Sequence, residues 1–309
     1  MKTSAHKQHR PFIKKIRDAI IKIFSEKSLL FRHLFLFSMG LTSVTRLKRR
    51  KILRFEVHAT DHCNLNCKGC EHFSSVANEE FLDINIFERD CARLSELTKR
   101  KIEDFAIVGG EPLLHPQITK IFDIARKYFP FDKIIVLTNG LLLLKLEDDF
   151  WENCRKNNII VTITKYPIKL DFQTIEKKAQ SHGVKMEYMG STGTIIKTMR
   201  INPLDLEGNQ IPKKSFKYCY MSNYCIHLRD GKLYTCPRVP NIHFFNQYFN
   251  QELKVTEKDY IDIFEVNNLT EILDRLCRPI PFCRYCNTTG VIHGTEWAIS
   301  KQNIKEWTI

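Results

Sequence analysis

The chain has 309 residues, 43% of them hydrophobic, which suits a large globular domain with a smaller one beside it. Eleven cysteines, an odd number, argue against a scaffold held by disulfides and favour a reducing, cytoplasmic setting with metal chemistry. The net charge of +13 arises from residues 1–54, since the rest of the chain holds equal numbers of basic and acidic side chains. Composition therefore gives no reason to expect a nucleic-acid groove on the body of the chain.

Residues 11–27 predict a basic amphipathic helix, because apolar residues recur at helical spacing with lysines and arginines between them. The apolar run 29–41 contains Arg32 and His33 and is shorter than the ~20 apolar residues that span a bilayer. Its late start makes a secretory signal unexpected. Two interpretations stay open for residues 1–50: a helical extension packed on the body, or an arm lying on an anionic membrane at its inner face.

From Arg54 onward, strand-like and helix-like segments alternate. The strand-like runs are 53–59, 105–108, 133–137, 159–164 and 184–188, and the helical patterns are 86–97, 118–128, 146–156 and 172–182. Alternation of this kind predicts an α/β fold with parallel strands, in which function collects at the carboxyl ends of the strands. Residues 190–215 are rich in Gly, Thr, Asn, Pro and Lys, which predicts a loop or linker.

Three cysteines follow the first predicted strand: Cys63, Cys67 and Cys70, at Cys-x₃-Cys-x₂-Cys spacing. Thiolates this close must share one centre or stay free. A structural zinc ion wants four protein ligands, and no fourth cysteine or histidine follows at a usual finger spacing. Zinc is still not excluded by count, because three histidines lie nearby: His58, His62 and His72. On a 4Fe–4S cluster, three thiolates would leave one iron open to a small-molecule ligand.

Two further motifs follow later strands at the same expected edge of the sheet. Gly109-Gly110-Glu111-Pro112 comes directly after the run 105–108, and Thr138-Asn139-Gly140 comes directly after the run 133–137. With the three cysteines before them, they place polar and ligand-forming groups past the ends of three successive strands.

These three motifs, in this order, resemble those of the radical S-adenosylmethionine (SAM) superfamily. The resemblance implies a partial (β/α)₆ barrel and a 4Fe–4S cluster on Cys63, Cys67 and Cys70, with SAM on the open iron. Reductive cleavage of SAM would then yield a 5′-deoxyadenosyl radical that abstracts a hydrogen atom. The resemblance also implies an external electron donor such as flavodoxin or ferredoxin.

The resemblance carries further residue roles. It implies that Gly109, Gly110, Glu111 and Pro112 hold the SAM amino group, that Thr138 and Asn139 belong to the SAM site, and that Thr164 touches the ribose. The residue before the third cysteine is often aromatic in the family and lies near the adenine. Here it is Gly69, and Phe73 or His72 are the candidates to supply that surface.

A second cysteine group occupies the last third of the chain: Cys219, Cys225, Cys236, Cys283 and Cys286. Asp230-Gly231 lies between strand-like arms and predicts a β-hairpin before Cys236. A hairpin cysteine together with Cys283-x₂-Cys286 suits a cage of four thiolates. A zinc ribbon would use the same ligands, whereas Cys91, Cys154 and Cys277 fit structural positions.

The second group resembles the auxiliary-cluster region of the SPASM and twitch proteins within the same superfamily. No cysteine follows Cys286, so the shorter twitch version with one auxiliary 4Fe–4S cluster fits better. The resemblance implies Cys219, Cys236, Cys283 and Cys286 as ligands, with Cys225 as the alternative to Cys219. We expect a radical SAM core at 51–215 and an auxiliary-cluster domain at 216–309.

The sequence from Cys63 to Ser74 is similar to that of relatives associated with cell-surface glycan pathways. The resemblance therefore implies oxidation, or a related modification, of a sugar or glycan precursor. Peptide modification is the alternative within the enzyme class, although no compact peptide-recognition domain is evident. From a different class comes a non-catalytic iron–sulfur or zinc scaffold, which the intact Gly109-Gly110-Glu111-Pro112 motif argues against.

Overall fold

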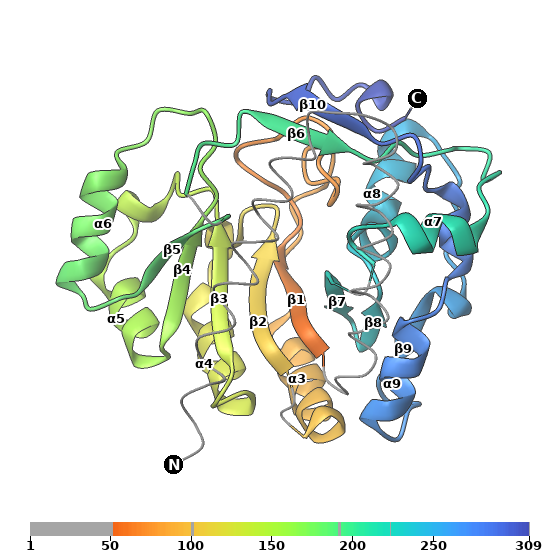
Figure 1. The fold of residues 1–309 in the computed structure, drawn as a ribbon. Coiled ribbons are helices and arrows are strands. Elements are labelled where there is room, and N and C mark those ends of the chain that lie inside the picture. The colour runs from red at the N-terminus through yellow and green to blue at the C-terminus, as the bar shows by residue number, and fades with distance from the viewer. Residues whose placement is uncertain (1–51, 100–101, 191–192, 223, 309) are drawn as a thin grey trace, which may run out of the picture.

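The computed structural model describes residues 52–99, 102–190, 193–222 and 224–308 (Figure 1). The predicted basic extension, residues 1–50, lies outside the described residues. Within the described ranges, no helix is both long enough and apolar enough to cross a membrane.

The described part is built around an eight-stranded sheet in the order β5-β4-β3-β2-β1-β7-β8-β9 (Figure 1). Neighbouring strands from β5 through β1 to β7 run parallel, whereas β8 and β9 add antiparallel to the edge. The strands are β1 Ile52–Thr60, β2 Ile102–Gly109, β3 Lys133–Thr138, β4 Ile159–Ile163, β5 Met186–Tyr188, β7 Ile226–Arg229, β8 Lys232–Tyr234 and β9 Tyr260–Asp262.

The predicted α/β class with a parallel sheet is confirmed. Helices α3 Ile84–Thr98, α4 Ile118–Tyr128, α5 Asp148–Lys156 and α6 Phe172–Ser181 alternate with the first five strands, as the sequence predicts. One feature of the order differs from a consecutive barrel. The sixth parallel strand, β7, lies beside β1 and not beyond β5, so β1 has a parallel neighbour on each side.

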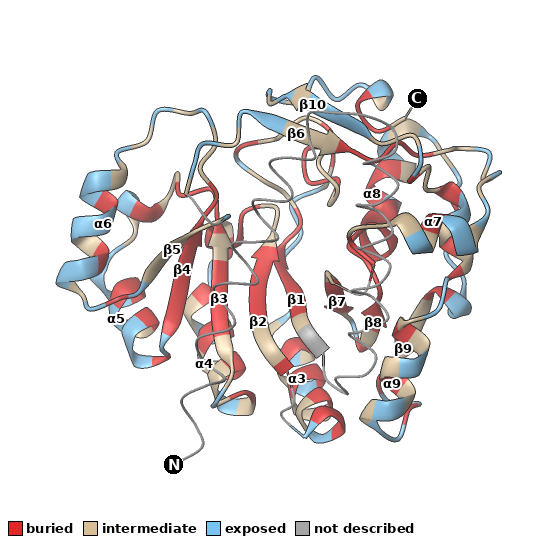
Figure 2. Ribbon diagram, in the orientation of Figure 1, coloured by how far each residue is buried: buried red, intermediate tan, exposed pale blue. Residues whose placement is uncertain are grey.

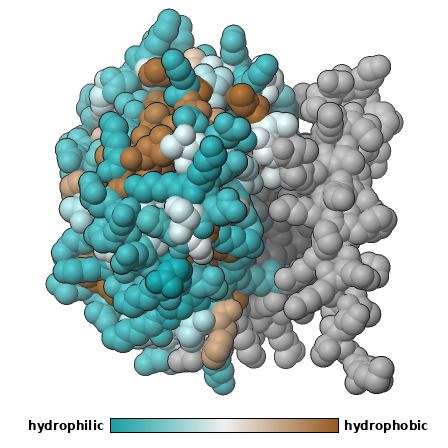
Figure 3. Space-filling view, turned by 90° about the vertical axis from the view of Figure 1, so that its left-hand side faces the viewer, coloured by the Kyte–Doolittle hydropathy of each residue, from teal (hydrophilic) through white to brown (hydrophobic). Residues whose placement is uncertain are grey.

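Apolar side chains explain why these strands lie at the centre. All five residues of β4 are buried, and β1, β2 and β3 are also mostly buried (Figure 2). Parallel strands covered on both faces need such near-continuous apolar runs. The helices add buried residues such as Leu94, Ile121 and Phe122 to the same core. By contrast, the molecular face in Figure 3 is mainly hydrophilic, with small apolar patches.

A second core lies under the C-terminal part of the chain. Helix α8 Arg238–Phe249 contributes Phe245, the end of the chain contributes Trp307, and the loop after the first cysteine group contributes Phe73. The segment 216–309, expected as a separate domain, supplies both cores. Its strands β7 to β9 and helix α9 Leu269–Leu276 join the core of the large sheet, whereas α8 joins the second core.

The predicted hairpin is confirmed. Strands β7 and β8 pair antiparallel around Asp230 and Gly231, whose φ angles of 51° and 72° are both positive. Two such residues in sequence suit the tight turn that matches the twist of a hairpin.

The prediction of a loop over 190–215 is wrong in part. Strand β6 Thr198–Ile201 lies within it, and helix α7 Pro212–Tyr218 begins within it. Strand β6 pairs with β10 Ile292–Glu296 in a separate two-stranded ribbon. A partner some ninety residues later leaves no local pattern in the sequence, which is why the strand was missed.

Candidate active site

The first cysteine group lies in the loop that leaves the carboxyl end of β1. Leu65 N donates to Cys63 Sγ at 3.4 Å, and Trp297 Nε1 donates to Cys67 Sγ at 3.3 Å. Burial, reinforced by the neighbouring thiols, raises the pKa of Cys63 to about 11 and that of Cys67 to about 12. Cys70 interacts with both thiols in the same way. Three partly buried thiols that disfavour one another's ionisation suit a cationic centre, which holds thiolates deprotonated.

The C-terminal segment covers this cysteine loop. Lys68 N donates to Ala298 O at 2.9 Å and Ser300 N donates to Asn66 O at 2.7 Å, so residues 297–300 run along residues 66–68. The Trp297 ring also packs against Tyr166, with centroids 5.7 Å apart. The sequence analysis missed both aromatic residues. An isolated tryptophan in a polar segment gives no signal until the topology brings it back to Cys67.

The two glycines of the second motif let β2 end directly against the cysteine loop. Gly110 N donates to Thr60 O at 2.9 Å, and Glu111 N donates to His62 O at 3.1 Å. A Cβ atom on Gly110 would lie 1.9 Å from His62 O, and one on Gly109 would lie 2.3 Å from Thr60 O. No side chain fits at such distances, so glycine is required by the close approach of two backbones.

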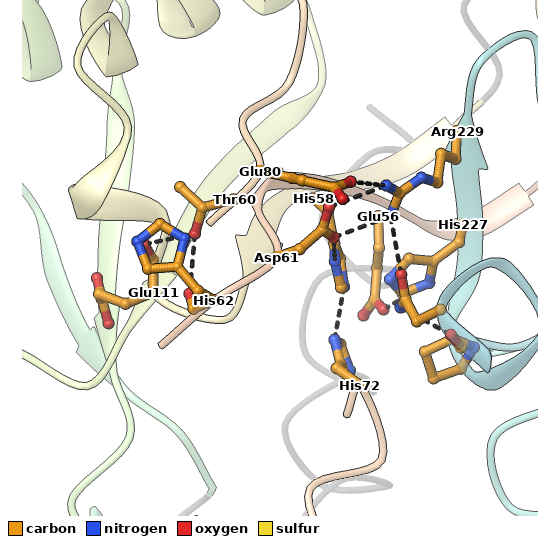
Figure 4. Close-up of polar contacts among 12 residues, drawn as sticks. Glu56, His58, Thr60, Asp61, His62, His72, Glu80, Glu111, His227 and Arg229 are labelled. Atoms are coloured by element: carbon orange, nitrogen blue, oxygen red, sulfur yellow. Dashed lines mark hydrogen bonds and ion pairs between the residues drawn. The ribbon is translucent and has the colours of Figure 1, made fainter. Parts of the chain in front are cut away.

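Glu111 joins the second motif to the third. Its carboxylate accepts from Thr138 Oγ1 at 2.7 Å, from Asn139 N at 2.9 Å and from Leu113 N at 3.1 Å. Thr60 Oγ1 donates to the backbone oxygen of Glu111 at 3.0 Å (Figure 4). Burial raises the pKa of Glu111 to about 7 against the effect of these hydrogen bonds. The carboxylate is therefore fixed in place before any ligand binds.

The remaining predicted SAM-site residues lie at the same edge. Asn139 Nδ2 donates to Asn64 Oδ1 at 2.8 Å and lies 3.9 Å from Cys63 Sγ. Thr164 is buried one residue past β4, and its N–H donates to Thr138 O at 3.0 Å. Pro112 begins the short 3₁₀ helix Pro112–Leu114. The edge thus collects Gly109 to Pro112, Thr138, Asn139 and Thr164 around the cysteine loop.

The substitutes considered for the aromatic residue before Cys70 have other places. Phe73 is fully buried in the second core against Phe245 and Trp307, so it offers no ring surface to a ligand. His72 Nδ1 lies at hydrogen-bond distance, 2.6 Å, from His58 Nε2. Gly69 has a φ of +60°, and a Cβ there would lie 2.9 Å from Glu306 O. This backbone contact explains why the position holds glycine.

Four cysteines of the second group line one small cavity. Cys219 ends α7, Cys236 follows β8, and Cys283 and Cys286 lie in and just after the 3₁₀ helix Pro281–Tyr285. Cys225 does not line this cavity and faces Glu56 instead. Thr288 Oγ1, also in the lining, is buried without a hydrogen-bond partner among the described residues. Four thiols around one space fit a 4Fe–4S cluster or zinc.

A buried arginine links the two cysteine groups. Arg238, 1% exposed, pairs with Glu71, the residue after Cys70, and also donates to Asn202 O. Its Nη1 donates to Cys286 Sγ at 3.7 Å. No local pattern in the sequence marks Arg238 for this position, because the segments that it joins meet only in the folded chain.

Comparison with known proteins agrees with this geometry. The family model for the radical SAM superfamily matches residues 57–178, which contain all three motifs. The match covers the part of the chain that carries the end of β1, the cysteine loop and strands β2 to β4.

Curated relatives share part of this region. GTP 3',8-cyclase of Desulforamulus reducens is 32% identical over 103 residues, covering 32% of this chain and 31% of that protein. GTP 3',8-cyclase of Clostridium botulinum (strain Okra) is 26% identical over 161 residues, covering 52% and 49%. The chain thus spans between about a third and a half of the length of these relatives.

Solved structures with some likeness include BtrN in complex with AdoMet and 2-DOIA, at 18% identity and a TM-score of 0.48, covering 76% of this chain and 92% of that one. Native anSMEcpe with bound AdoMet is similar at 14% identity and a TM-score of 0.43, covering 76% and 82%.

The raised pKa of Glu111 predicts a pH dependence of stability in the cluster-free protein. Between the ordinary value of 4.5 and about 7 the folded chain keeps a proton that the unfolded chain releases. Stability therefore falls as pH rises through that window, by at most about 3 kcal/mol. Glu111→Gln removes this titration. Urea unfolding at several pH values should show the wild type losing stability relative to the variant as pH rises.

Glu252→Gln, at an exposed carboxylate, is the matched control and should leave the pH dependence of the wild type unchanged. A constant difference between wild type and Glu111→Gln from pH 4.5 to pH 8 would show that Glu111 titrates normally.

Proposed function

We propose that this protein is a radical SAM enzyme that abstracts a hydrogen atom from a sugar or glycan precursor. The carrying observation is the hydrogen-bonded edge at which Glu111 connects the cysteine loop of β1, the exit of β2 and the exit of β3. Under this hypothesis, SAM and a 4Fe–4S cluster would supply the 5′-deoxyadenosyl radical. The electrons would come from a donor such as flavodoxin or ferredoxin.

The chain's own residues have distinct tasks in this proposal. Cys63, Cys67 and Cys70 would hold the cluster, and the Glu111 carboxylate with the neighbouring backbone would bind the SAM amino group. Thr138 and Asn139 keep that carboxylate in place through the bonds at 2.7 and 2.9 Å. Trp297 and Tyr166 cover part of the cysteine loop and reduce its contact with water.

We further propose that Cys219, Cys236, Cys283 and Cys286 hold an auxiliary 4Fe–4S cluster. Their common cavity, which Cys225 does not line, supports this choice of ligands. An electron acceptor near the substrate suits a two-electron oxidation, in which hydrogen abstraction is followed by loss of one electron. A zinc ion on the same four thiols is the competing occupant.

A nucleoside triphosphate is a second candidate substrate, because the curated relatives that match the core are named GTP 3',8-cyclases. Nucleotide sugars combine both chemistries. A panel of GTP, nucleotide sugars, free sugars and a precursor peptide, assayed for substrate-dependent 5′-deoxyadenosine, separates these classes from peptide modification.

The central prediction concerns SAM cleavage. The anaerobically reconstituted protein, given SAM and dithionite, should bind about eight irons per chain, four per cluster, and should form 5′-deoxyadenosine. Cys67→Ala should reduce product to the level of a protein-free control and remove about half of the iron. Cys154→Ala, at a buried cysteine of α5 in the large core, is the matched control and should retain both. If the iron-loaded wild type forms no 5′-deoxyadenosine with any substrate of the panel, the scaffold interpretation is favoured.

The contact between Arg238 and Cys286 predicts a change in redox potential. Positive charge and hydrogen bonds at a ligand sulfur stabilise the reduced cluster. Arg238→Gln should therefore lower the midpoint potential of the auxiliary cluster. If the reduced cluster loses about 1.4 kcal/mol of stabilisation, the shift in a one-electron couple is on the order of 60 mV. A redox titration followed by electron paramagnetic resonance measures this shift.

The control is Arg200→Gln, which removes the same charge from an arginine that stacks on Tyr220. Equal potentials in wild type and Arg238→Gln, at unchanged iron content, would contradict a role of Arg238 at the auxiliary cluster.

We also propose that residues 1–50 bring the protein to an anionic membrane surface. Their concentration of positive charge supports this idea. Deletion of residues 1–50 should abolish co-sedimentation with anionic vesicles, and neutral vesicles should not bind either form. Failure of the full-length protein to bind anionic vesicles at low salt would rule the arm out as a membrane anchor.

A further inference from the structure

Three histidines from distant parts of the sequence meet beside β1. His58 lies on β1, His72 lies in a turn after Cys70, and His227 lies on β7. One ring nitrogen from each lies within 4.8 Å of the others (Figure 4). The planes of the His58 and His72 rings are nearly parallel, with centroids 4.8 Å apart, and His227 meets both rings edge-on. The cysteine groups proposed above use none of these side chains.

Carboxylates behind two of the rings fix which nitrogens face inward. Asp61 Oδ1 lies 2.9 Å from His58 Nδ1, and His227 Nδ1 faces two acceptors, Glu56 Oε2 at 3.3 Å and Cys225 O at 3.4 Å. A carboxylate accepts, so each Nδ1 carries the proton and each Nε2 presents its lone pair to the centre of the group. A carboxylate behind a ligating imidazole is the usual partner of a metal-binding histidine.

The group is not satisfied by hydrogen bonds alone. His58 Nε2 lies 2.6 Å from His72 Nδ1. The N–H of His72 can therefore donate to the lone pair of His58 Nε2. His227 Nε2 is buried, at 1% exposure of the residue, and has no hydrogen-bond partner among the described residues. An unpaired buried nitrogen is costly, and a cation at the centre would satisfy it.

We infer that His58, His72 and His227 form a binding site for a divalent transition-metal ion, for which zinc is the reference. The ligand atoms are His58 Nε2, His72 Nδ1 and His227 Nε2, and imidazole suits zinc among such ions. Zinc–nitrogen bonds of 2.0–2.1 Å place two tetrahedral ligands about 3.3 Å apart. His72 Nδ1, on a ring carried by a turn, must therefore move about 0.7 Å farther from His58 Nε2 than its present 2.6 Å.

The charged groups around the histidines neutralise one another, and one coordination position stays open. Arg54 pairs with Glu56 at 2.6 Å, and Arg229 pairs with Asp61 through two bonds of 2.9 Å. Both carboxylates therefore stay fixed behind the rings and do not reach the ion. Among the described residues no fourth histidine, cysteine or carboxylate joins the group, so water completes the coordination. Such an ion would tie the cysteine loop to the seam between β1 and β7.

His115 shows how a buried histidine differs when it has only a packing role. Its Nε2 lies 3.0 Å from Leu82 O, and Gln117 N donates to its Nδ1 at 3.0 Å. Both ring nitrogens are thus used by backbone groups. It is the matched control for the test.

The test uses the full-length protein after anaerobic reconstitution with iron and sulfide, then equilibration with zinc and desalting. We expect about one zinc per chain in addition to the iron. Zinc-edge X-ray absorption should show nitrogen or oxygen neighbours at about 2.0–2.1 Å and no sulfur at about 2.3 Å. His227→Ala and His227→Gln should lose the zinc and keep the iron, whereas His115→Ala should keep both.

Three results would overturn the site: no zinc on the iron-loaded wild type, zinc bound through sulfur, or zinc retained by both His227 variants. Absorption at the zinc edge of the wild type needs no variant, so a His227 variant that fails to fold does not decide the matter. Neither readout depends on SAM cleavage. The zinc site is therefore tested independently of the proposed enzyme activity.

Discussion

Strand β1 is hydrogen-bonded in parallel to β2 on one side and to β7 on the other, and the candidate site depends on this arrangement. Phe55 faces Phe105 in one register and Ile226 in the other. Parallel neighbours end at the same edge of a sheet, so three segments far apart in sequence leave the core side by side. The exit of β1 therefore has the exits of β2 and β7 on its two flanks, and the cysteine loop lies between them.

Backbone packing and buried charge hold the two flanks. On the β2 side, only glycine at position 110 lets the chain lie against His62 O. On the β7 side, Arg229 binds both carboxylate oxygens of Asp61. Although burial opposes ionisation, His58 and Arg229 hold the pKa of Asp61 at about 2. The cysteine loop thus begins from a point where steric fit fixes one side and a buried ion pair fixes the other.

Local patterns were enough to predict the α/β order but not the way the chain closes on itself. Strands β1 to β4 and helix α4 agree with their predicted ranges within a few residues, because buried parallel strands and amphipathic helices each leave a strong periodic signal. Motif spacing likewise gathered Cys63, Glu111 and Asn139 correctly at one edge. The position of β7 beside β1, the β6–β10 ribbon and the return of Trp297 to Cys67 all rest on long-range pairing. Such pairing depends on which surfaces fit after the core has formed, and no short window of sequence records it.

The link through Arg238 means that the two cysteine groups form one electrostatic unit. Glu71 and the Cys286 thiol both face this single buried cation, so a change in the charge of either alters the balance felt by the other. Burial weakens screening by solvent and salt, which makes such coupling stronger than it would be at the surface. Glu71 is bonded directly to Cys70, and so a shift of Arg238 is transmitted to the loop that carries the first group. The geometry therefore couples the charge at one cysteine group to the position of the thiols at the other.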